Sequence, residues 1–411
     1  MMPVDNDVVF RDIPEADIER ALELVYLAFH GRPEEERREH HRRLLQGCER
    51  IGAYDGDTLV GTLCAFPFTM SVPGGELPCP GVTFVSVAPT HRRRGVLSGM
   101  MRELFRRCAA DGRPMAALWA SESVIYGRFG YGEGTRGLLV EIDARRPLAL
   151  RIEPDGRPLR LVSPEDAPEL LAPYYERTRA GRAGRIARTE RWWREEWLAE
   201  KDSDDEELSP PRIVALGEPL AGYAIYRTRS GDEDTGRPGV LWVYEIEADS
   251  PHVAAALWRY LVSIDLIGVV KAWGRPADDP LLLFAADRDQ VKVTAEWPGL
   301  WVRLVDARAA LESRSWAADI DLALEVRDGL APGNAGVHRL TVKDGVASCR
   351  PSEDAPDLTF EVRDLAACYL GGTRAAHAVQ AGVATEHTPG SAALLDAALA
   401  TGHLPHTVDE F

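Results

Sequence analysis

The sequence has few cysteines and histidines, and they are not arranged as metal ligands. The six cysteines, at positions 48, 64, 79, 108, 349 and 368, include no CxxC pair. The ten histidines are scattered apart from a doublet at 40 and 41, which lies in a charged stretch typical of a solvated helix face. Structural zinc sites draw on closely spaced Cys and His residues. We therefore expect no metal, and reduced thiols in a cytoplasmic protein.

The chain also lacks a recognisable signal peptide and a long apolar run. We therefore expect no membrane span and a cytoplasmic location, with secretion left open as an alternative. Positive charge is in the minority, because 48 lysines and arginines face 65 aspartates and glutamates, for a net charge of −17. An acidic surface repels phosphates, which argues against nucleic acid as the main partner and favours a cationic substrate.

A local basic patch interrupts this acidic background. Residues 85–95 read Val-Ser-Val-Ala-Pro-Thr-His-Arg-Arg-Arg-Gly, and apolar residues then recur at helical spacing from Leu97 to Cys108. The first backbone N–H groups of a helix have no intrahelical partners and favour an anion. The arginine turn between a strand and a helix is therefore predicted to hold a pyrophosphate. A merely solvated basic run is the weaker alternative at such a position.

The following segment, residues 117–132, begins as a strand and ends in glycine turns. It reads Ala-Leu-Trp-Ala-Ser-Glu-Ser-Val-Ile-Tyr-Gly-Arg-Phe-Gly-Tyr-Gly. The order strand, Arg-x-x-Gly, helix resembles motif A of the GCN5-related N-acetyltransferases (GNATs), and this second segment resembles the one found in the Eis family of these enzymes. The resemblance covers essentially the whole chain, including its length of 411 residues and its terminal Asp409-Glu410-Phe411.

The resemblance implies an α/β (α+β) fold class, with tandem GNAT-like domains, the second degenerate, followed by a sterol-carrier-protein-like α+β domain. A chain of this length is expected to divide into two or three domains. We place the domains at residues 1–148, 149–290 and 291–411. In the first, the residue pattern predicts a helix at 18–29, a hairpin over 51–66, a strand at 82–88, a helix at 97–108 and a strand at 115–120.

The second region repeats this order more weakly. Its pattern predicts helices at 165–178, 189–200 and 252–266, and strands at 212–216, 220–228 and 240–247. Where the first region has an arginine turn, this one has Ala248-Asp249-Ser250-Pro251. We therefore expect a scaffold that does not bind coenzyme A.

The third region is predicted to form strands at 319–327, 336–343 and 357–362 and a helix at 364–370. We expect it to support the core and to deliver the C-terminus, and a lipid-carrying tunnel is the alternative.

The resemblance implies acetyl-coenzyme A as cosubstrate. Its pyrophosphate is expected at the turn, and its pantetheine arm is expected along a strand that splays from its neighbour. The backbone N–H of Val87 would point at the thioester carbonyl, and one such donor is typically worth about 3 kcal/mol of barrier. Leu97 stands where the general GNAT motif has Gly or Ala. The expected cofactor-binding residues are Val85, Ser86, Val87, Arg92, Arg93, Arg94, Gly95, Val96, Leu97, Ser121 and Glu122.

The resemblance also implies the catalytic groups. Tyr126 is expected to be the general acid that protonates the leaving thiolate, since a phenol with a reference pKa of about 10 is protonated at neutral pH. The free α-carboxylate of Phe411 is expected to accept a proton from the acceptor amine. The alternatives are a packed core tyrosine and a frayed chain end.

The acceptor is expected to be a small cationic amine, such as an aminoglycoside or a polyamine, or a lysine side chain, acetylated by direct transfer. A cleft of aromatic and acidic side chains favours such cations, and we expect substrate contacts at Phe29, Phe84, Trp197, Asp409 and Glu410. The resemblance further implies a homohexamer. The rival interpretation is a catalytically lapsed scaffold that binds coenzyme A, or a lipid-binding module built on the C-terminal domain.

Overall fold

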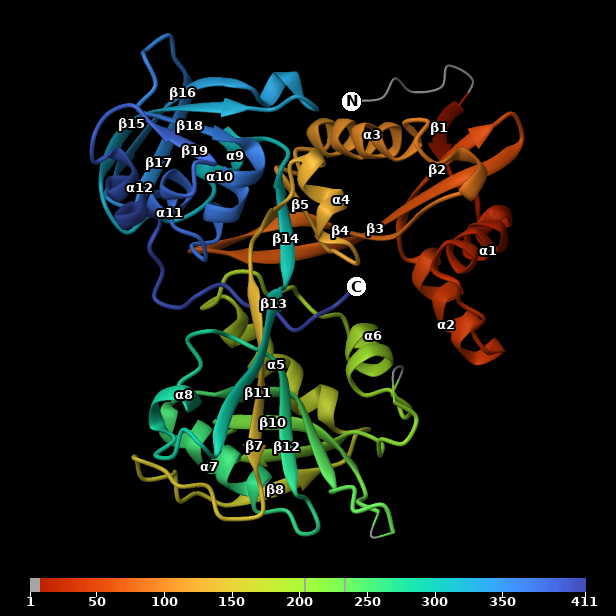
Figure 1. Ribbon diagram of the computed structural model, residues 1–411, viewed down its shortest axis with the longest axis vertical. Coiled ribbons are helices and arrows are strands. Elements are labelled where there is room, and N and C mark those ends of the chain that lie inside the picture. Colours follow the sequence, from red (N-terminus) through yellow and green to blue (C-terminus); the bar gives the residue numbers. More distant parts are fainter. Residues whose placement is uncertain (1–7, 203–204, 233) are drawn as a thin grey trace. The chain divides into compact units, whose positions relative to one another are not determined.

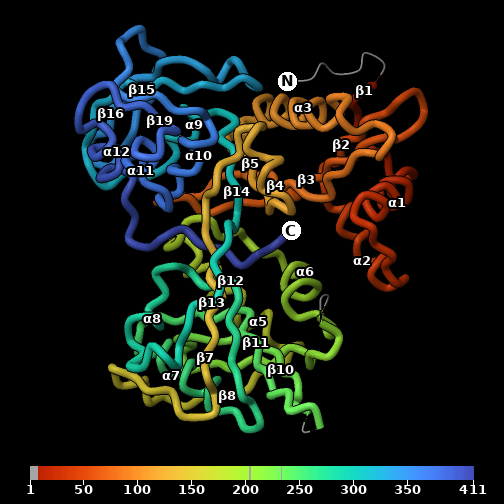
Figure 2. The backbone as a smooth tube through the Cα atoms, viewed as in Figure 1, coloured from red at the N-terminus to blue at the C-terminus, as the bar shows by residue number. Residues whose placement is uncertain are grey.

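The computed structural model describes residues 8–202, 205–232 and 234–411 (Figure 1). The described residues form two compact units, each with its own sheets and core. Unit 1 comprises three stretches of the chain: the described residues up to Gly134, then Leu300–Gly402, and finally Glu410–Phe411. Unit 2 comprises Thr135–Gly299 and His403–Asp409. The units are therefore built from discontinuous stretches of chain, as the colours of the backbone trace make visible (Figure 2).

The first sheet of unit 1 has the strand order β1-β2-β3-β4-β5-β14-β6. β4 and β5 are parallel, and the other neighbouring pairs are antiparallel. Long apolar runs, buried over much of their length, explain the central strands β3 and β4. The bounds are β1 Val8–Asp12, β2 Glu49–Asp55, β3 Thr58–Val72, β4 Gly75–Val87, β5 Met115–Trp119, β6 Gly132–Glu133 and β14 Leu300–Leu304.

The helices of this part are α1 (Ile18–Phe29), α2 (Glu35–Gln46), α3 (Val96–Ala110) and the short α4 (Ser123–Tyr126). The apolar side chains that recur along α3 are buried in the core between the helix and the sheet, and they include Met100, Leu104 and Cys108. Gly99 on α3 has a specific packing role, because a Cβ atom there would collide with the ring of Phe10 on β1. The helix predicted over 97–108 is therefore present, one residue longer at its start and two at its end.

Unit 2 contains a sheet with the order β13-β7-β12-β11-β10-β9-β8. β11 and β12 are parallel, like β4 and β5 in unit 1. Its strands are β7 Arg136–Asp143, β8 Leu159–Val162, β9 Arg212–Leu216, β10 Gly222–Arg229, β11 Val240–Ala248, β12 Val269–Arg275 and β13 Val291–Pro298. Its helices are α5 Ala167–Arg179, α6 Glu190–Trp192, which continues as a π-helical turn over Trp193–Trp197, α7 Pro251–Val262 and α8 Leu281–Phe284.

Strand pairing does not follow the boundaries expected near residues 148 and 290. β7 pairs with β12 and β13 in the sheet of unit 2, although it directly follows the glycine turns of the first region. Conversely, β14 follows the strands of unit 2 in the chain but pairs with β5 and β6 in the first sheet of unit 1. Each strand shows a pattern of buried residues that would suit either sheet, so the local sequence does not indicate which sheet it joins. The functional division at these boundaries stays a prediction.

The C-terminal region of unit 1 forms a separate sheet with the order β17-β16-β15-β18-β19. Three of its strands and α10 match the predicted elements within two residues, whereas β17, β19, α9, α11 and α12 were not predicted. The bounds are β15 Ile320–Arg327, β16 Gly336–Lys343, β17 Val346–Pro351, β18 Leu358–Glu361 and β19 Ala384–Glu386, with α9 Ala307–Glu312, α10 Val362–Tyr369, α11 Ala375–Gln380 and α12 Ser391–Leu399.

Candidate active site

The first sheet opens between its two central parallel strands. Within the described residues, the β4–β5 ladder consists of Gly81 opposite Ala117 and Val82 opposite Leu118. β4 then continues to Val87 while it pairs on its other edge with β3. The backbone groups of β4 beyond Val82 that face β5 are therefore outside that ladder, and an extended ligand could pair with them.

A bulge shapes β4 at this opening. Thr62 lies opposite Ser86 and Cys64 lies opposite Thr83, so β4 carries one extra residue over this stretch. Phe84 adopts a left-handed conformation there, with φ of 47°. The buried Thr62 hydroxyl donates to the Phe84 carbonyl at 2.8 Å, and its oxygen lies 2.9 Å from the Ser86 hydroxyl. Because Thr62 has one proton to give, Ser86 is the donor of the second bond.

The sequence prediction missed Thr62. A polar residue within a strand gives no sequence signal that it contacts a bulge on the neighbouring strand. The bonds of Thr62 to Phe84 and Ser86 could therefore be recognised only once the strand register was known.

The arginine turn joins β4 to α3. Gly95 has φ of 79° and immediately precedes the helix, and Arg93 is also left-handed, with φ of 63°. The first backbone bond within α3 runs from the Gly99 N–H to the Gly95 carbonyl at 2.9 Å, so the N–H groups of residues 96–98 precede it. Val96 is buried, whereas Leu97 is partly buried against the same core and is accommodated in the turn.

Fewer basic side chains are exposed in this turn than the basic run in the sequence suggests. Arg92 and Arg93 are exposed, and Arg94 is half-buried. His91 is held by its neighbours, because its Nε2 lies 3.1 Å from an Asp55 carboxylate oxygen and its Nδ1 lies 2.8 Å from the Thr90 hydroxyl. The arginines and the start of α3 are therefore the groups that can receive a diphosphate.

Tyr126 ends α4, which follows β5 after the exposed residues Ser121 and Glu122. It is 7% exposed and belongs to the same core cluster as Val82 and Leu118, the last residues of the β4–β5 ladder. Burial, with a smaller contribution from the charge of Glu122, raises the pKa of Tyr126 to about 12. The phenol is therefore neutral throughout the physiological range.

The glycines that follow Tyr126 allow the C-terminal region to approach closely. A Cβ atom at Gly130, which has φ of 81°, would collide with the Arg303 guanidinium of β14. A Cβ atom at Gly132 would collide with the Arg363 carbonyl of α10, and one at Gly127 would lie 3.0 Å from the Arg363 guanidinium. The glycine spacing of this motif therefore reflects packing against β14 and α10.

Arg303 anchors this contact. It is fully buried and pairs with Asp328, which also accepts from the Asn334 amide at 3.0 Å. Its guanidinium lies over the ring of Phe105 on α3, 4.9 Å from the ring centre. Tyr131 is fully buried and packs edge-on to Tyr126 at 6.1 Å, as expected for a packing residue. Arg303, held by an ion pair within the C-terminal region, thus packs beside Gly130 in the segment that carries Tyr126.

The last residue of the chain packs on the first sheet. The ring of Phe411 contacts Phe68 and Phe66 of β3, with ring centres 4.9 and 6.5 Å away. A Cβ atom at Gly81 would lie 2.9 Å from the Phe411 ring. Gly81 is the first residue of the two-residue β4–β5 ladder, so the Phe411 ring lies one residue before Val82, after which β4 parts from β5. Phe411 is held by ring contacts rather than frayed.

The predicted cleft residues are divided between the units. In unit 1, Phe84 packs edge-on to His41 at 5.7 Å, and Phe29 is exposed at the end of α1. Glu410 is also exposed. In unit 2, Trp197 and Asp409 are buried together, and the indole N–H of Trp197 donates to Asp409 at 2.8 Å.

Asp409 is engaged with protein donors in unit 2. Its carboxylate also accepts from Trp192 at 3.0 Å, from Arg188 at 2.8 Å and from Tyr175 at 3.2 Å. These internal donors anchor Asp409 and leave its carboxylate little capacity for a ligand, and the substrate contacts expected at Trp197 and Asp409 stay a prediction.

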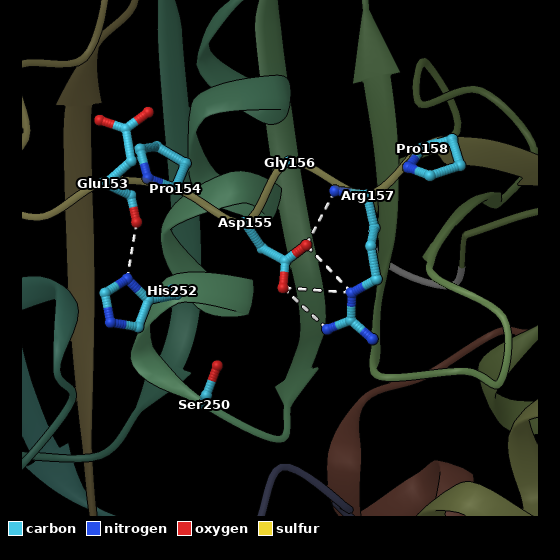
Figure 3. A pocket seen from close by; sticks show the side chains of 8 residues that line it. All are labelled: Glu153, Pro154, Asp155, Gly156, Arg157, Pro158, Ser250 and His252. Carbon is cyan, nitrogen blue, oxygen red and sulfur yellow. Dashed lines mark hydrogen bonds and ion pairs between the residues drawn. The ribbon is translucent and has the colours of Figure 1, made fainter.

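Unit 2 also has a shallow hollow at the start of α7 (Figure 3). Its side chains are largely paired: Arg157 binds Asp155 through bonds of 2.8–3.2 Å, and His252 bonds the Glu153 carbonyl at 2.6 Å. It contains none of the predicted site residues. No cluster of three or more His, Cys, Asp or Glu side chains suited to a metal ion occurs in the described part of the chain. Among these same residues, no helix combines the length and apolarity needed to cross a bilayer.

Family models match three parts of the chain. The acetyltransferase (GNAT) domain matches residues 9–134 and again 184–304, and the sterol carrier protein domain matches residues 307–408. The predicted fold class is thereby confirmed. The protein is an N-acetyltransferase of the GNAT class, with two such domains followed by a sterol-carrier-like one.

Individual relatives narrow the assignment. An N-acetyltransferase of Streptomyces avermitilis, itself uncharacterized, is 40% identical over 371 residues, which cover 89% of this chain and 90% of the relative. The N-acetyltransferase Eis of Mycobacterium tuberculosis is 36% identical over 340 residues, 79% of each chain. The crystal structure of Eis1 from Mycobacterium abscessus superposes with a TM-score of 0.84 at 31% identity, covering 98% of this chain and 100% of that one. The chain belongs to the Eis family of N-acetyltransferases.

Proposed function

We propose that this enzyme transfers the acetyl group of acetyl-coenzyme A directly to a primary amine of a cationic acceptor. Tyr126 serves as the general acid and the α-carboxylate of Phe411 as the general base. The observation that carries the proposal is the packing of Phe411 beside Gly81, in the short ladder after which β4 parts from β5. A chain end held beside this ladder would bring its carboxylate close to the strand opening that the cosubstrate needs.

The turn and the strand opening suit the two ends of the cosubstrate. The exposed Arg92 and Arg93, with the first N–H groups of α3, would hold the pyrophosphate through charge-assisted bonds. Val85, Ser86 and Val87 would pair with the pantetheine amides, and Ser121 and Glu122 would flank the arm. The bulge held by Thr62 would set the direction of the Val87 N–H toward the thioester oxygen.

Tyr126 would donate to the departing sulfur. Its pKa of about 12 lies above that of a thiol, near 8.5, so complete proton transfer to the thiolate is uphill by roughly 1.4 kcal/mol per unit of difference. The phenol therefore acts mainly as a hydrogen-bond donor as negative charge develops on sulfur, and the tyrosinate is short-lived.

The C-terminal carboxylate would receive the proton released by the amine as it attacks. With a reference pKa of about 3.5, it is a weak base for an ammonium, so the amine must lose its proton when its own pKa is depressed in the cleft. The same negative charge attracts the cation. Phe29, Phe84 and Glu410 would contribute the remaining aromatic and acidic contacts, and aminoglycoside-like compounds, polyamines and lysine side chains fit this chemistry.

The test measures thiol release from acetyl-coenzyme A with a panel of amines. We expect multiply charged amines to be acetylated by the native enzyme. Tyr126→Phe and a form extended by two residues beyond Phe411 should bind acetyl-coenzyme A normally but turn over at least about 100-fold more slowly. Unchanged turnover in both variants would refute the assigned roles. We also propose a homohexamer in the cytoplasm. Sedimentation of the purified enzyme tests the hexamer, and cell fractionation tests the location.

A further inference from the structure

Unit 2 repeats the strand opening of unit 1 on different residues. β10 and β11 are antiparallel, with Ile225 opposite Glu245 and Tyr226 opposite Val243, so Tyr244 is an extra residue in β11. The parallel β11–β12 ladder ends at Val243 opposite Ala272. β11 therefore has a bulge and then parts from its parallel neighbour, as β4 does from β5.

The C-terminal segment His403–Asp409 lies against the β12 side of this opening. The His406 N–H donates to the Ala183 carbonyl at 2.8 Å, and the buried His406 ring donates through Nε2 to the carbonyl of Gly274. Gly274 lies two residues after the last ladder residue of β12, and a Cβ atom there would lie 2.9 Å from the Val408 side chain. One backbone bond to Ala183, one side-chain bond to the Gly274 carbonyl and a close glycine contact thus hold this segment beside the end of β12.

Asp409 ties the segment to the β11 side. Arg188 donates from Nε to the Asp409 carboxylate at 2.8 Å and from another nitrogen to Glu245 of β11 at 2.7 Å. The Arg188 guanidinium lies between the rings of Tyr175 and Trp197, 3.9 Å from the centre of each. Together with the two indole donors, this cage presents a cation and neutral N–H groups to one carboxylate, so it selects an acidic side chain.

The same opening is unsuited to a coenzyme. α7 begins after Ser250, whose hydroxyl accepts from the Val253 N–H at 3.3 Å and so occupies one of the groups that would bind a phosphate. Asp249 precedes it and accepts from the Tyr174 hydroxyl at 2.8 Å. The Asp249 carboxylate repels the anion that the arginine turn of unit 1 attracts, and the Ser250 cap occupies a donor that would bind it.

We propose that the opening between β11 and β12 is a peptide-binding site whose ligand is the chain's own C-terminal segment, residues 403–409, anchored by Asp409. This occupant takes the place of a second acetyl-coenzyme A. The proposal rests on the proposed function in one respect: Asp409 is a positioning residue for the carboxylate of Phe411. Two residues span at most about 7 Å, so an anchor at Asp409 restricts where the chain end can lie.

The experiment uses the full-length enzyme. Carboxypeptidase A releases a C-terminal phenylalanine, and its rate reports how often the tail leaves its site, while hydrogen exchange reports protection of residues 403–409. We expect Asp409→Asn to speed phenylalanine release at least 10-fold and to lower protection in the tail, with β11 and α7 unchanged. Glu190→Gln, an exposed acidic residue on the neighbouring helix α6, is the matched control and should behave as the native enzyme.

A second measurement guards against a folding defect. Synthetic peptide 403–411 added to the Asp409→Asn enzyme should bind saturably, change the fluorescence of Trp192 and Trp197, and outcompete the same peptide carrying Asp409→Asn. Protection that is unchanged in the variant, loss of protection throughout unit 2, or absence of saturable peptide binding would each overturn the peptide site.

Turnover of the same samples separates this proposal from the proposed function. We expect slower acetyl transfer by Asp409→Asn, with an unchanged KM for acetyl-coenzyme A. If the tail is released faster while turnover stays native, the peptide site stands, and both the base assignment for Phe411 and the positioning role of Asp409 fall.

Discussion

Phe411 lies edge-on to Phe68, with ring centres 4.9 Å apart and ring planes at 62°. Terminal residues are usually the least ordered part of a chain. Here the Phe411 side chain packs on a strand of the first sheet, so the carboxylate that we propose as the base is carried by an anchored residue. Aromatic contacts of this geometry are worth about 0.5–1.5 kcal/mol beyond the area they bury, and together with burial of the ring they favour the docked end.

Enlarging Gly81 tests this contact from the other side. A Cβ atom there would lie 2.5 Å from Phe68 and 2.9 Å from Phe411, so Gly81→Ala must displace at least one ring. We expect turnover to fall at least about 10-fold, and overpacking of this kind typically costs 1–3 kcal/mol of stability. Steady-state kinetics and urea unfolding measure the two effects.

The matched control for Gly81→Ala is Gly156→Ala, since a Cβ atom at Gly156 meets nothing within 4 Å. It should leave turnover and stability near the native values. Native turnover in Gly81→Ala would show that the position of the Phe411 ring does not matter for the reaction.

Removing the exposed arginines should weaken cofactor binding without changing chemistry. Arg92→Ala combined with Arg93→Ala deletes two cations at the start of α3, so we expect the KM for acetyl-coenzyme A to rise about 10-fold or more and kcat to stay within a factor of about two. The salt dependence of the KM should also become shallower. Arg350→Ala, an exposed arginine on β17, serves as the control. An unchanged KM in the double variant would exclude the turn as the pyrophosphate site.

The raised pKa of Tyr126 predicts the alkaline behaviour of the enzyme. Burial and the Glu122 charge raise this pKa to about 12, so the phenol keeps its proton as the pH passes 10. The kcat profile should therefore show no loss with a midpoint near 10. Because the folded pKa lies above that of the unfolded chain, the stability contributed by Tyr126 is complete below about pH 10 and disappears between about pH 10 and 12. A falling limb of kcat near pH 10 that is absent in Tyr126→Phe would contradict the raised pKa of this phenol.

The buried Arg303–Asp328 pair should govern how firmly the C-terminal region supports the catalytic segment. Asp328→Asn leaves the Arg303 charge buried without its counterion, which typically costs about 3–5 kcal/mol. Arg303→Met combined with Asp328→Asn removes both charges and should recover part of that loss. Chemical unfolding measures the stability of the three proteins. A double variant less stable than Asp328→Asn alone would show that the charge pair is not the source of the effect.

Local patterns predicted most elements but not how the sheets are assembled. For example, α3 could be predicted from local features alone, namely the helical spacing from Leu97 to Cys108 and the glycine turn at 95. The exchange of β7 and β14 between the units depends on long-range pairing that no local pattern encodes. The Trp-rich helix was predicted over 189–200, and the structure ends it at Trp197, in a π-helical turn beside the cage around Asp409.

For a similar reason, the sequence identified some residues of the candidate site but not the contacts that hold them. The arginine turn and Tyr126 lie in continuous motifs, so the sequence and its family resemblance identify them. Thr62 contacts the β4 bulge from a neighbouring strand, and Asp409 meets Arg188 across more than 200 residues. Because these partners are defined by register and by the path of the tail, the sequence pointed to neither contact.

The most direct test of the account replaces the Phe411 carboxylate by a carboxamide through semisynthesis, which changes the charge and basicity of the chain end while the ring and its contacts remain. A chain ligated with native phenylalanine by the same route is the control. The account predicts that the amide lowers kcat at least about 100-fold, with the KM for acetyl-coenzyme A unchanged. An amidated enzyme that turns over at the rate of its control would contradict the claim that the C-terminal carboxylate is the base.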